Sequence, residues 1–364
     1  MSQKHIIVIG AGPIGLSSAL LLLNSGHSVT IIARDFPAPF ETIDPISQIN
    51  YTAPWAGAHN RFIPPSPSVP HTQLEHSLSL ITYNHMKSLY ESPHRKEAGI
   101  TFLPGIEYLE APSAEYLSLS KPNNPILNQL YQLCGYKILS PEYFPDTKIK
   151  WGCKYESYCL NPMVYLSFLL RRFFYLGGKL LKRELRCPEE VFSLNLGTDI
   201  VVNASGTNFG LDPAVFITRG QTVLVKESCP VTITRQNKDG TYSFSVPRGY
   251  QGGTIIGGTR EVNNWSMEAD LEVRKKLLKG FVEMYPDILG ENGKKELTVL
   301  RDIVGRRPTR NGGPRIEGEK IEGKGFIMHA YGFGGRGFEL SWGVAEMVRD
   351  GVEGWLRGKE KGKL

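Results

Sequence analysis

The first thirty-five residues alternate between short apolar runs and a glycine-rich turn. Ile6–Ile9 is a β-branched run of the kind found in strands buried on both faces. The turn "GAGPIG" and a longer apolar stretch follow, and this stretch ends at Ser25-Gly26. Val29–Ile32 is a second apolar run. The pattern predicts a strand, a tight turn, a helix and a second strand.

The glycines of the turn have the spacing G-x-G-x-x-G. Gly10 permits the turn, Gly12 lets the backbone approach a pyrophosphate, and Gly15 allows the helix to pack on the sheet. The N-terminus of the helix offers unpaired N–H groups to the phosphates. Asp35 follows the second strand, where a carboxylate accepts hydrogen bonds from a ribose 2′-hydroxyl. These residues predict a dinucleotide site but do not distinguish NAD from FAD.

The middle of the chain contains two helical patterns. Residues 75–91 have helical spacing, and a second helix is expected between Asn161-Pro162 and Gly177-Gly178. Residues 36–75 are rich in Pro, Ser and Ala, so we expect loops there. The composition of residues 111–128 indicates a surface insertion.

Two further strand patterns suggest discontinuous domains. Residues 199–206, "DIVVNASG", predict a buried strand whose small final residues suit a second contact with the dinucleotide. "TYSFSVPRGYQGGTIIGGTR" alternates and turns like an antiparallel hairpin. The expected fold class is α/β, with a doubly wound, Rossmann-like cofactor domain and a substrate domain built on a large mixed or antiparallel sheet. We assign residues 1–60, 150–212 and 300–364 to the first domain, and 61–149 and 213–299 to the second.

Composition narrows the function classes. The 364 residues are 41% hydrophobic with a net charge of +6. Lys and Arg are spread along the chain, so we do not expect nucleic-acid binding. The five cysteines lack paired C-x-x-C spacing, so neither a metal site nor a disulfide framework is expected. The apolar stretch "IGLSSALLLL" is far shorter than a membrane span, and we expect a soluble protein.

The last eighty residues favour a flavin. "GFIMHAYGFGGRGFELSWGVAEMVRDG" predicts a strand, a glycine-rich loop and a helix that starts near Phe338. A helix N-terminus carries roughly half a positive charge. Beside an isoalloxazine ring that charge would favour the anionic, reduced flavin, whereas a nicotinamide loses its positive charge on reduction. We therefore prefer FAD to NAD.

The sequence resembles the FAD-dependent D-amino acid oxidase and D-aspartate oxidase family. The matching pieces are "VIGAGPIGLSSAL", "ARD", "PWAGA", "VVNASG", "RGQTVLV", "VGRRP" and "IMHAYGFGGRGFELSWGVA". The last is the most specific, and together they extend from one end of the chain to the other. The resemblance implies that a D-amino acid is oxidised by hydride transfer to flavin N5, and that O₂ reoxidises the flavin to give H₂O₂. Orientation of the substrate then does most of the catalytic work.

The resemblance also implies site residues. Those expected to bind FAD are Gly10, Gly12, Ile14, Gly15, Arg34, Asp35, Ser47, Gln48, Gly57, Ala58, Gly206, Gly332, Gly334, Gly335, Gly337 and Phe338. Arg307 matches the arginine that clamps the α-carboxylate, and its neighbour Arg306 is expected to be structural. The carbonyl of Gly335 matches the position that binds the substrate ammonium. An aromatic side chain of "TYSFSVP" should cover the substrate, either Tyr242, which we prefer, or Phe244.

The segment "GGTR" suggests which D-amino acids are oxidised. In relatives that act on neutral D-amino acids the residue after "GGT" is typically aromatic, whereas in D-aspartate oxidases it is arginine, here Arg260. Those oxidases also carry an arginine seven residues before the strand tyrosine, which corresponds to Arg235. Two arginines at these positions would form a second anionic clamp for a β- or γ-carboxylate. Arg61 and Glu339 are further candidates for the pocket.

Three other readings stay open at this stage. One is a D-amino acid oxidase for neutral side chains, with Arg260 turned to solvent. The others are an NAD-linked dehydrogenase and a non-catalytic FAD-binding protein. The C-terminal Gly362-Lys363-Leu364 keeps the last two positions of a peroxisomal signal, so we expect a peroxisomal location, or otherwise a cytoplasmic one. The expected partners are a small D-amino acid and O₂, and homo-oligomerisation is left open.

Overall fold

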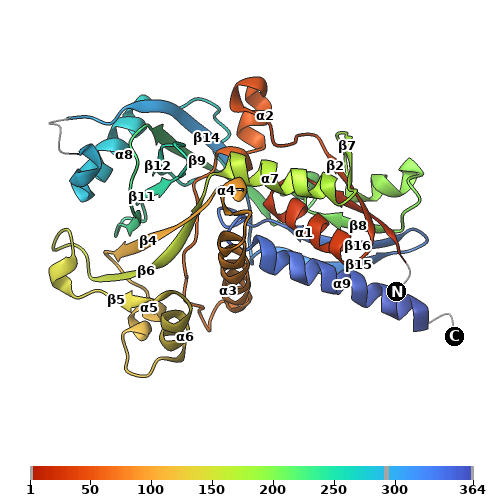
Figure 1. Ribbon diagram of the computed structural model, residues 1–364, viewed down its shortest axis with the longest axis horizontal. Coiled ribbons are helices and arrows are strands. Elements are labelled where there is room, and N and C mark those ends of the chain that lie inside the picture. The colour runs from red at the N-terminus through yellow and green to blue at the C-terminus, as the bar shows by residue number, and fades with distance from the viewer. Residues whose placement is uncertain (1–2, 291–294, 362–364) are drawn as a thin grey trace.

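The computed structural model describes residues 3–290 and 295–361, which form two sheets side by side along the long axis of the molecule (Figure 1). The smaller sheet has six strands in the order β15-β16-β8-β1-β2-β7. Its strands are β1 (His5–Ile9), β2 (Ser28–Ala33), β7 (Lys179–Lys182), β8 (Ile200–Asn203), β15 (Arg315–Ile321) and β16 (Gly325–Tyr331). β15 is an antiparallel edge strand and the other pairs are parallel. The expected Rossmann-like arrangement is confirmed.

The alternation of side chains along β1 explains why this strand is apolar throughout. Ile6 and Val8 belong to the main hydrophobic core, whereas Ile7 and Ile9 belong to a smaller core on the opposite face. A 3₁₀ segment, Pro188–Leu194, contributes to that second core. Both faces of the sheet are therefore covered, as the sequence pattern predicts.

The larger sheet has ten strands, and most of its pairs are antiparallel. They are β3 (Ala58–His59), β4 (Ile100–Leu109), β5 (Lys137–Ile138), β6 (Trp151–Leu160), β9 (Val215–Val225), β10 (Thr232–Gln236), β11 (Tyr242–Pro247), β12 (Thr254–Gly257), β13 (Glu261–Val262) and β14 (Val299–Arg310). β4 and β10 pair in parallel. β11 and β12 form the antiparallel hairpin that the sequence predicts.

Three strands lie in a different sheet from the one the expected domain boundaries imply. β3 pairs with β6, β6 pairs with β4 over its whole length, and β14 pairs with β9 from Val299 to Arg310. All three belong to the larger sheet, although boundaries at residues 60, 150 and 300 assign them to the cofactor domain. Their long-range partners decide the sheet, and no local pattern in the sequence reveals those partners.

The helices include those that the sequence pattern predicts and several that it did not, among them the helix over residues 271–284. They are α1 (Pro13–Asn24), α2 (Pro45–Asn50), α3 (Pro70–Glu91), α4 (Arg95–Ala98), α5 (Ala114–Leu119), α6 (Pro125–Cys134), α7 (Pro162–Tyr175), α8 (Leu271–Met284) and α9 (Ser341–Lys361). The expected loop of residues 36–75 contains α2, because Pro45 occupies the first helical position after the N-cap Asp44. α9 begins at Ser341, three residues after the expected Phe338.

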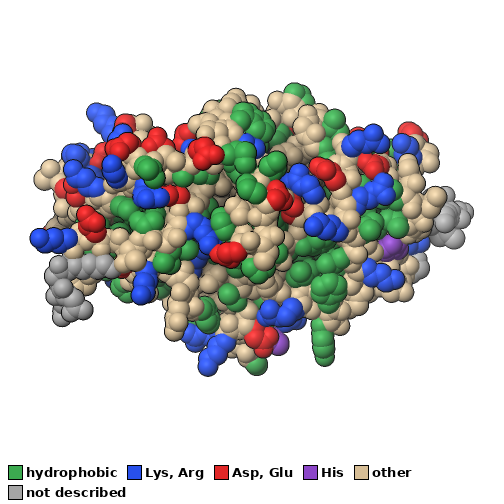
Figure 2. Space-filling view, turned by 90° about the horizontal axis from the view of Figure 1, so that it is seen from above, with side chains coloured by type: hydrophobic (Ala, Val, Ile, Leu, Met, Phe, Trp, Pro, Cys, Tyr) green, Lys and Arg blue, Asp and Glu red, His purple; other side chains and the backbone are tan. Residues whose placement is uncertain are grey.

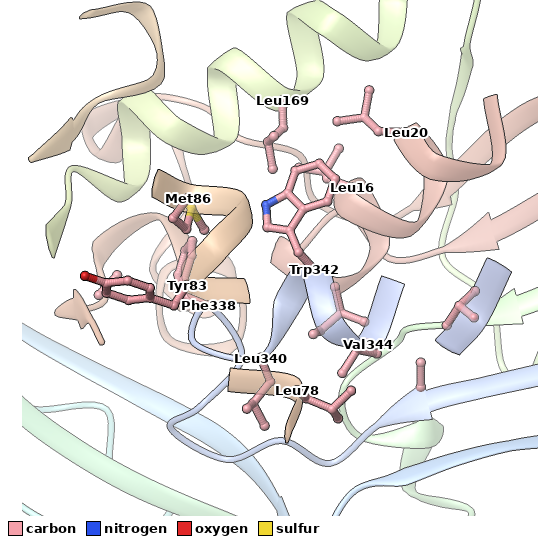
Figure 3. Packing of buried hydrophobic residues seen from close by; sticks show 14 of the residues in the cluster. Leu16, Leu20, Leu78, Tyr83, Met86, Leu169, Phe338, Leu340, Trp342 and Val344 are labelled. Atoms are coloured by element: carbon pink, nitrogen blue, oxygen red, sulfur yellow. The ribbon is translucent and has the colours of Figure 1, made fainter. Parts of the chain in front are cut away.

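The main core lies where α1, α3, α7 and α9 meet (Figure 3). Trp342 of α9 is buried there near Leu16 and Leu169, and its indole Nε1 donates a hydrogen bond of 2.7 Å to the hydroxyl of Tyr165. This packing fixes the start of α9 against α1. The glycine turn before α1 and the glycine-rich loop before α9 are thereby held on one side of the smaller sheet.

Three further observations concern the surface charges, the length of the helices and the possible metal ligands. Lys and Arg side chains are mixed with Asp and Glu over the face shown in Figure 2. Within residues 3–290 and 295–361, no helix is long and apolar enough to cross a membrane. The same residues contain no group of three or more His, Cys, Asp or Glu side chains arranged to hold a metal ion.

Candidate active site

A cavity of about 1320 Å³ is lined by residues of both sheets. One part of its wall is the glycine turn between β1 and α1. Another part is formed by β9, β11 and β14 of the larger sheet, with Tyr242, Arg260 and Arg307. One cavity therefore contains both a glycine-rich, nucleotide-type site and a second, polar site.

The glycine turn has the geometry of a pyrophosphate site. Gly10 has a φ of 100°, which L side chains rarely adopt. Gly12 is the N-cap of α1, and a Cβ at this position would meet nothing within 4 Å. The backbone therefore faces open space at the N-terminus of the helix, where anions bind favourably. Asp35 also lines the cavity and accepts a hydrogen bond of 2.8 Å from Nε of Arg34.

Most residues expected to bind the cofactor line this cavity. They are Gly10, Gly12, Ile14, Arg34, Asp35, Gly57, Ala58, Gly206, Gly332, Gly334, Gly335, Gly337 and Phe338. Gly15 does not line the cavity. It lets α1 pack closely on Gly10, because a Cβ on Gly15 would overlap the carbonyl oxygen of Gly10. Ser47 is buried at the start of α2. The amide of Gln48 donates to the carbonyls of Phe40 and Ile43, both at 2.9 Å, so Gln48 serves the local loop, and neither Ser47 nor Gln48 lines the cavity.

The loop between β16 and α9 lines the cavity beside the glycine turn, because a Cβ on Gly337 would lie 3.6 Å from Cγ of Pro13 at the start of α1. Gly332 and Gly334 have φ of 83° and 57°, so glycine suits both positions. The N–H of Gly332 donates to the carbonyl of Gly206, and that of Gly334 to the carbonyl of Pro308. These bonds connect the loop to both sheets and place Gly335 in the cavity wall.

Arg307 extends from β14 toward β9, where Gly220 provides space for it. A Cβ on Gly220 would overlap Nη2 of Arg307. Nη2 donates a hydrogen bond of 3.1 Å to the carbonyl of Thr259. Burial and the positive charge of Arg260 lower the pKa of Arg307 from its usual value. No carboxylate of the described residues lies within 4 Å of its guanidinium, so this half-buried cation of the cavity wall has no ion-pair partner among them.

Arg260 lies just after β12 and is exposed on the cavity side. Within the described part of the chain it forms no ion pair or hydrogen bond. Arg306 also lacks a carboxylate, but it donates to Asn50 and to the carbonyl of Trp265, and it lies 5.1 Å from the indole centroid. Arg306 is thus engaged structurally, as expected.

Other arginines of the cavity wall are neutralised. Arg61 donates to Glu107 at 2.7 Å, and Arg310 donates to Asp212 at 2.8 Å. Arg336 pairs with Glu75 and with Glu339, the second through a bond of 2.6 Å. Arg61 and Glu339 therefore lie in the pocket as expected, but each already has a partner.

Tyr242 and Phe244 both line the cavity. The ring of Phe244 packs on Gly257 and Gly258, where a Cβ would overlap it or nearly so, and its centroid lies 6.3 Å from that of His59. Tyr242 has no such packing partner among the described residues, and it is one of the groups that act on the pKa of Arg307. Phe244 therefore forms part of the wall, and Tyr242 as the residue that covers the substrate stays a prediction.

Arg235 does not line the cavity, which corrects the expectation of an anionic clamp formed with Arg260. Its guanidinium pairs with Glu110 and, at 2.6 Å, with Asp146. Side chains on a strand alternate between its faces, so Arg235 of β10 points away from the face that Thr234 presents to the cavity. We exclude Arg235 from the proposed substrate contacts.

Sequence reasoning missed Gly220, Glu75 and Arg336. A glycine inside the strand pattern "RGQTVLV" is a recognised sign of close approach and could have identified Gly220. The pairing of Glu75 with Arg336 joins residues that are far apart in the chain, and no signal in the sequence predicts it.

Comparisons with known proteins agree with this geometry. The sequence profile of a family described as FAD-dependent oxidoreductase matches residues 5–350. A D-aspartate oxidase of Talaromyces thermophilus is 39% identical over 98% of this chain and 96% of its own length. A D-amino-acid oxidase of Fusarium vanettenii is 31% identical over 95% of this chain and 96% of its own length.

Solved structures show the same fold at low sequence identity. An L-proline dehydrogenase from P. horikoshii has a TM-score of 0.69 at 19% identity, covering 96% of this chain and 93% of its own. A glycine oxidase from Bacillus cereus has a TM-score of 0.66 at 16% identity, covering 97% of this chain and 95% of its own. At these identities the likeness concerns the fold alone.

Proposed function

The chain belongs to the FAD-dependent oxidoreductase family, and we propose that it is an oxidase of acidic D-amino acids, with D-aspartate as the preferred substrate. The observation that carries this proposal is the presence of Arg307 and Arg260 in one cavity without carboxylate partners among the described residues. Arg307 is partly withdrawn from water without a counter-charge, which a carboxylate would supply. Arg260, exposed on the cavity side, offers a second cation, so the two arginines together suit a ligand with two carboxylates.

The residues of the cavity fit FAD as the cofactor. The glycine turn and the N-terminus of α1 would hold its pyrophosphate, and Asp35 would accept from a ribose hydroxyl. When bound, FAD would supply the acceptor for the hydride of the substrate α-carbon, and O₂ would take up the electrons to give H₂O₂. The chain itself supplies the orientation of the substrate.

Arg307 would bind the α-carboxylate. Its planar guanidinium can make two parallel charge-assisted hydrogen bonds, which fix the orientation of a carboxylate as well as its position. The bond to the carbonyl of Thr259 and the space at Gly220 hold the guanidinium in one place. Tyr242 would cover the substrate and donate its hydroxyl to the same carboxylate. The carbonyl of Gly335 would accept from the substrate ammonium.

Arg260 would bind the side-chain carboxylate and so set the preference for acidic substrates. A hydrogen bond to a charged group contributes about 1.5–3 kcal/mol, which corresponds to about ten- to a hundredfold in discrimination. A neutral side chain would leave this arginine without an anion. The similarity to the D-aspartate oxidase of Talaromyces thermophilus supports the same preference.

The test is a substrate panel with the purified protein. We expect a flavin absorption spectrum and H₂O₂ formation with D-aspartate, a lower rate with D-glutamate, much lower rates with D-alanine and D-methionine, and none with L-aspartate. D-alanine or D-methionine ahead of D-aspartate would contradict the assignment of Arg260. Absence of turnover with every D-amino acid would contradict the oxidase itself.

A second candidate is a D-amino acid oxidase for neutral substrates. It is favoured by the exposure of Arg260, which could then face solvent, and by the similarity to the D-amino-acid oxidase of Fusarium vanettenii. The same panel distinguishes the two candidates. The peroxisomal location rests on Gly362-Lys363-Leu364, which lie outside the described residues, and it stays a prediction that suits an enzyme producing H₂O₂.

A further inference from the structure

Three charged side chains meet in the cavity wall beside the glycine-rich loop. Arg336 of this loop donates from Nη1 to Glu75 of α3, and from Nη2 and Nε to Glu339, at 2.6 and 3.2 Å. All three side chains line the cavity, with exposed fractions of 18% for Arg336, 12% for Glu75 and 9% for Glu339. Two carboxylates share one guanidinium, so this Glu75–Arg336–Glu339 network carries one net negative charge.

The groups around the network neutralise it only in part. Glu339 lies two residues before the start of α9, whose N-terminus carries roughly half a positive charge. His71 Nε2 lies 3.9 Å from Glu75 and adds a positive charge only when protonated. Burial lowers the pKa of His76, the other nearby histidine, so that it stays neutral. Arg61 is itself paired with Glu107. A largely buried negative charge in a cavity wall is costly unless a cation faces it. The structure thus calls for a cationic ligand group here.

We propose that the Glu75–Arg336–Glu339 network is the electrostatic complement of the substrate ammonium. The inference rests on the proposed function, and it adds residues that select for an amino group. Gly335 precedes Arg336, and a Cβ on Gly335 would lie 3.8 Å from Cδ of Arg307. The loop that carries Arg336 and Glu339 therefore passes beside the arginine assigned to the α-carboxylate, and the network lines the same cavity as that arginine.

The charges of the whole site then match one class of molecule. Arg307 and Arg260 provide two positive charges, and the network provides one negative charge. An acidic D-amino acid has two carboxylates and one ammonium, so its two negative charges and one positive charge complement those of the site. A dicarboxylate without the ammonium would satisfy the arginines but would leave the network without a counter-charge. The network consequently discriminates amino acids from the corresponding plain acids.

The test uses the variant Glu75→Gln in the FAD-loaded enzyme. The amide keeps an acceptor for Arg336 and removes the net charge. We expect the KM for D-aspartate to rise about tenfold. The inhibition constant of succinate, which lacks the ammonium, should stay within about twofold or fall, because a negative charge near its carboxylates is gone. Glu97→Gln, at a side chain 61% exposed on α4, is the matched control and should change neither constant.

Two outcomes would overturn the proposal. Equal rises of both constants would mean that the variant damages the site in general, and no change in either would mean that the network does not face the ammonium. If Glu75→Gln fails to fold, Glu339→Gln gives the same comparison, because it removes the same net charge. If D-alanine proves to be the substrate instead of D-aspartate, the pair D-alanine and propanoate replaces D-aspartate and succinate. An effect confined to D-alanine would then support the network while refuting the acidic preference.

Discussion

The guanidinium of Arg307 occupies the space where a side chain of Gly220 would lie. The two residues are on neighbouring antiparallel strands, and Gly220 is paired with Gly305, two residues before Arg307. The absence of a side chain at position 220 therefore determines where the arginine can point. One glycine of β9 positions the cation that we assign to the α-carboxylate.

A methyl group at this position should displace the arginine. In Gly220→Ala we expect kcat/KM for the preferred D-amino acid to fall about a hundredfold, which is the size of a lost charge-assisted contact. The flavin spectrum should be retained, because the glycine turn is not affected. Gly354→Ala in α9, where a Cβ would meet nothing within 4 Å, is the control. Wild-type kinetics in Gly220→Ala would contradict the assignment of Arg307.

The planar shape of the guanidinium should matter as much as its charge. We expect Arg307→Lys to lower kcat/KM about a hundredfold, since an ammonium cannot make two parallel bonds to one carboxylate. Arg306→Lys, in which only the bonds to Asn50 and Trp265 change, should cost less than about threefold. Steady-state kinetics on both variants makes the comparison. A similar loss in both would show that position 307 has no special role.

Arg235 should act on stability and not on substrate choice. Its side chain is 12% exposed and pairs with Glu110, which is 14% exposed, and with Asp146. Arg235→Leu leaves two carboxylates without their cation, so we expect a loss of about 2 kcal/mol in the free energy of unfolding. The ratio of kcat/KM for D-aspartate to that for D-alanine should stay within twofold. A fall in this ratio without a loss of stability would restore Arg235 to the substrate site.

The enzyme should lose stability as the pH falls from 6.5 toward 4. The ring of His85 stacks on Trp342 at 3.5 Å, and burial together with Arg172 lowers the pKa of His85 to about 4. Below pH 6.5 the unfolded chain takes up a proton that the folded protein does not, so stability decreases. Between pH 7.5 and 5, we expect the free energy of unfolding of His85→Gln to fall by about 1–2 kcal/mol less than that of the wild type. Urea unfolding at both pH values measures this. Parallel curves for the two proteins would contradict it.

Local patterns predicted the parts of the fold that local sequence determines. The glycine spacing and the β-branched runs identified β1, α1 and β2, and the short strand after Asp199 was also correct. The placement of β6 and β14 in the larger sheet could not be predicted, because each of them pairs with a strand that is far away in the chain. The expectation of loops throughout residues 36–75 was wrong at Pro45 and Pro70, where proline begins α2 and α3.

The same distinction holds for the active site. Arg260 and Arg307 could be identified because each belongs to a short motif. Arg235 also fitted a spacing, but its partners Glu110 and Asp146 come from other segments and hold it outside the cavity. The network of Glu75 with Arg336 was missed for the same reason. Charge pairing between distant segments decides which arginines are free to bind a ligand.

The most direct test of the central claim is the ratio of kcat/KM for D-aspartate to kcat/KM for D-alanine, measured in the wild type and in Arg260→Tyr. If Arg260 binds the side-chain carboxylate, the ratio is well above one in the wild type, and the substitution lowers it about ten- to a hundredfold, mainly through the D-aspartate term. A wild-type ratio below one, or a ratio that the substitution leaves unchanged, would contradict the account.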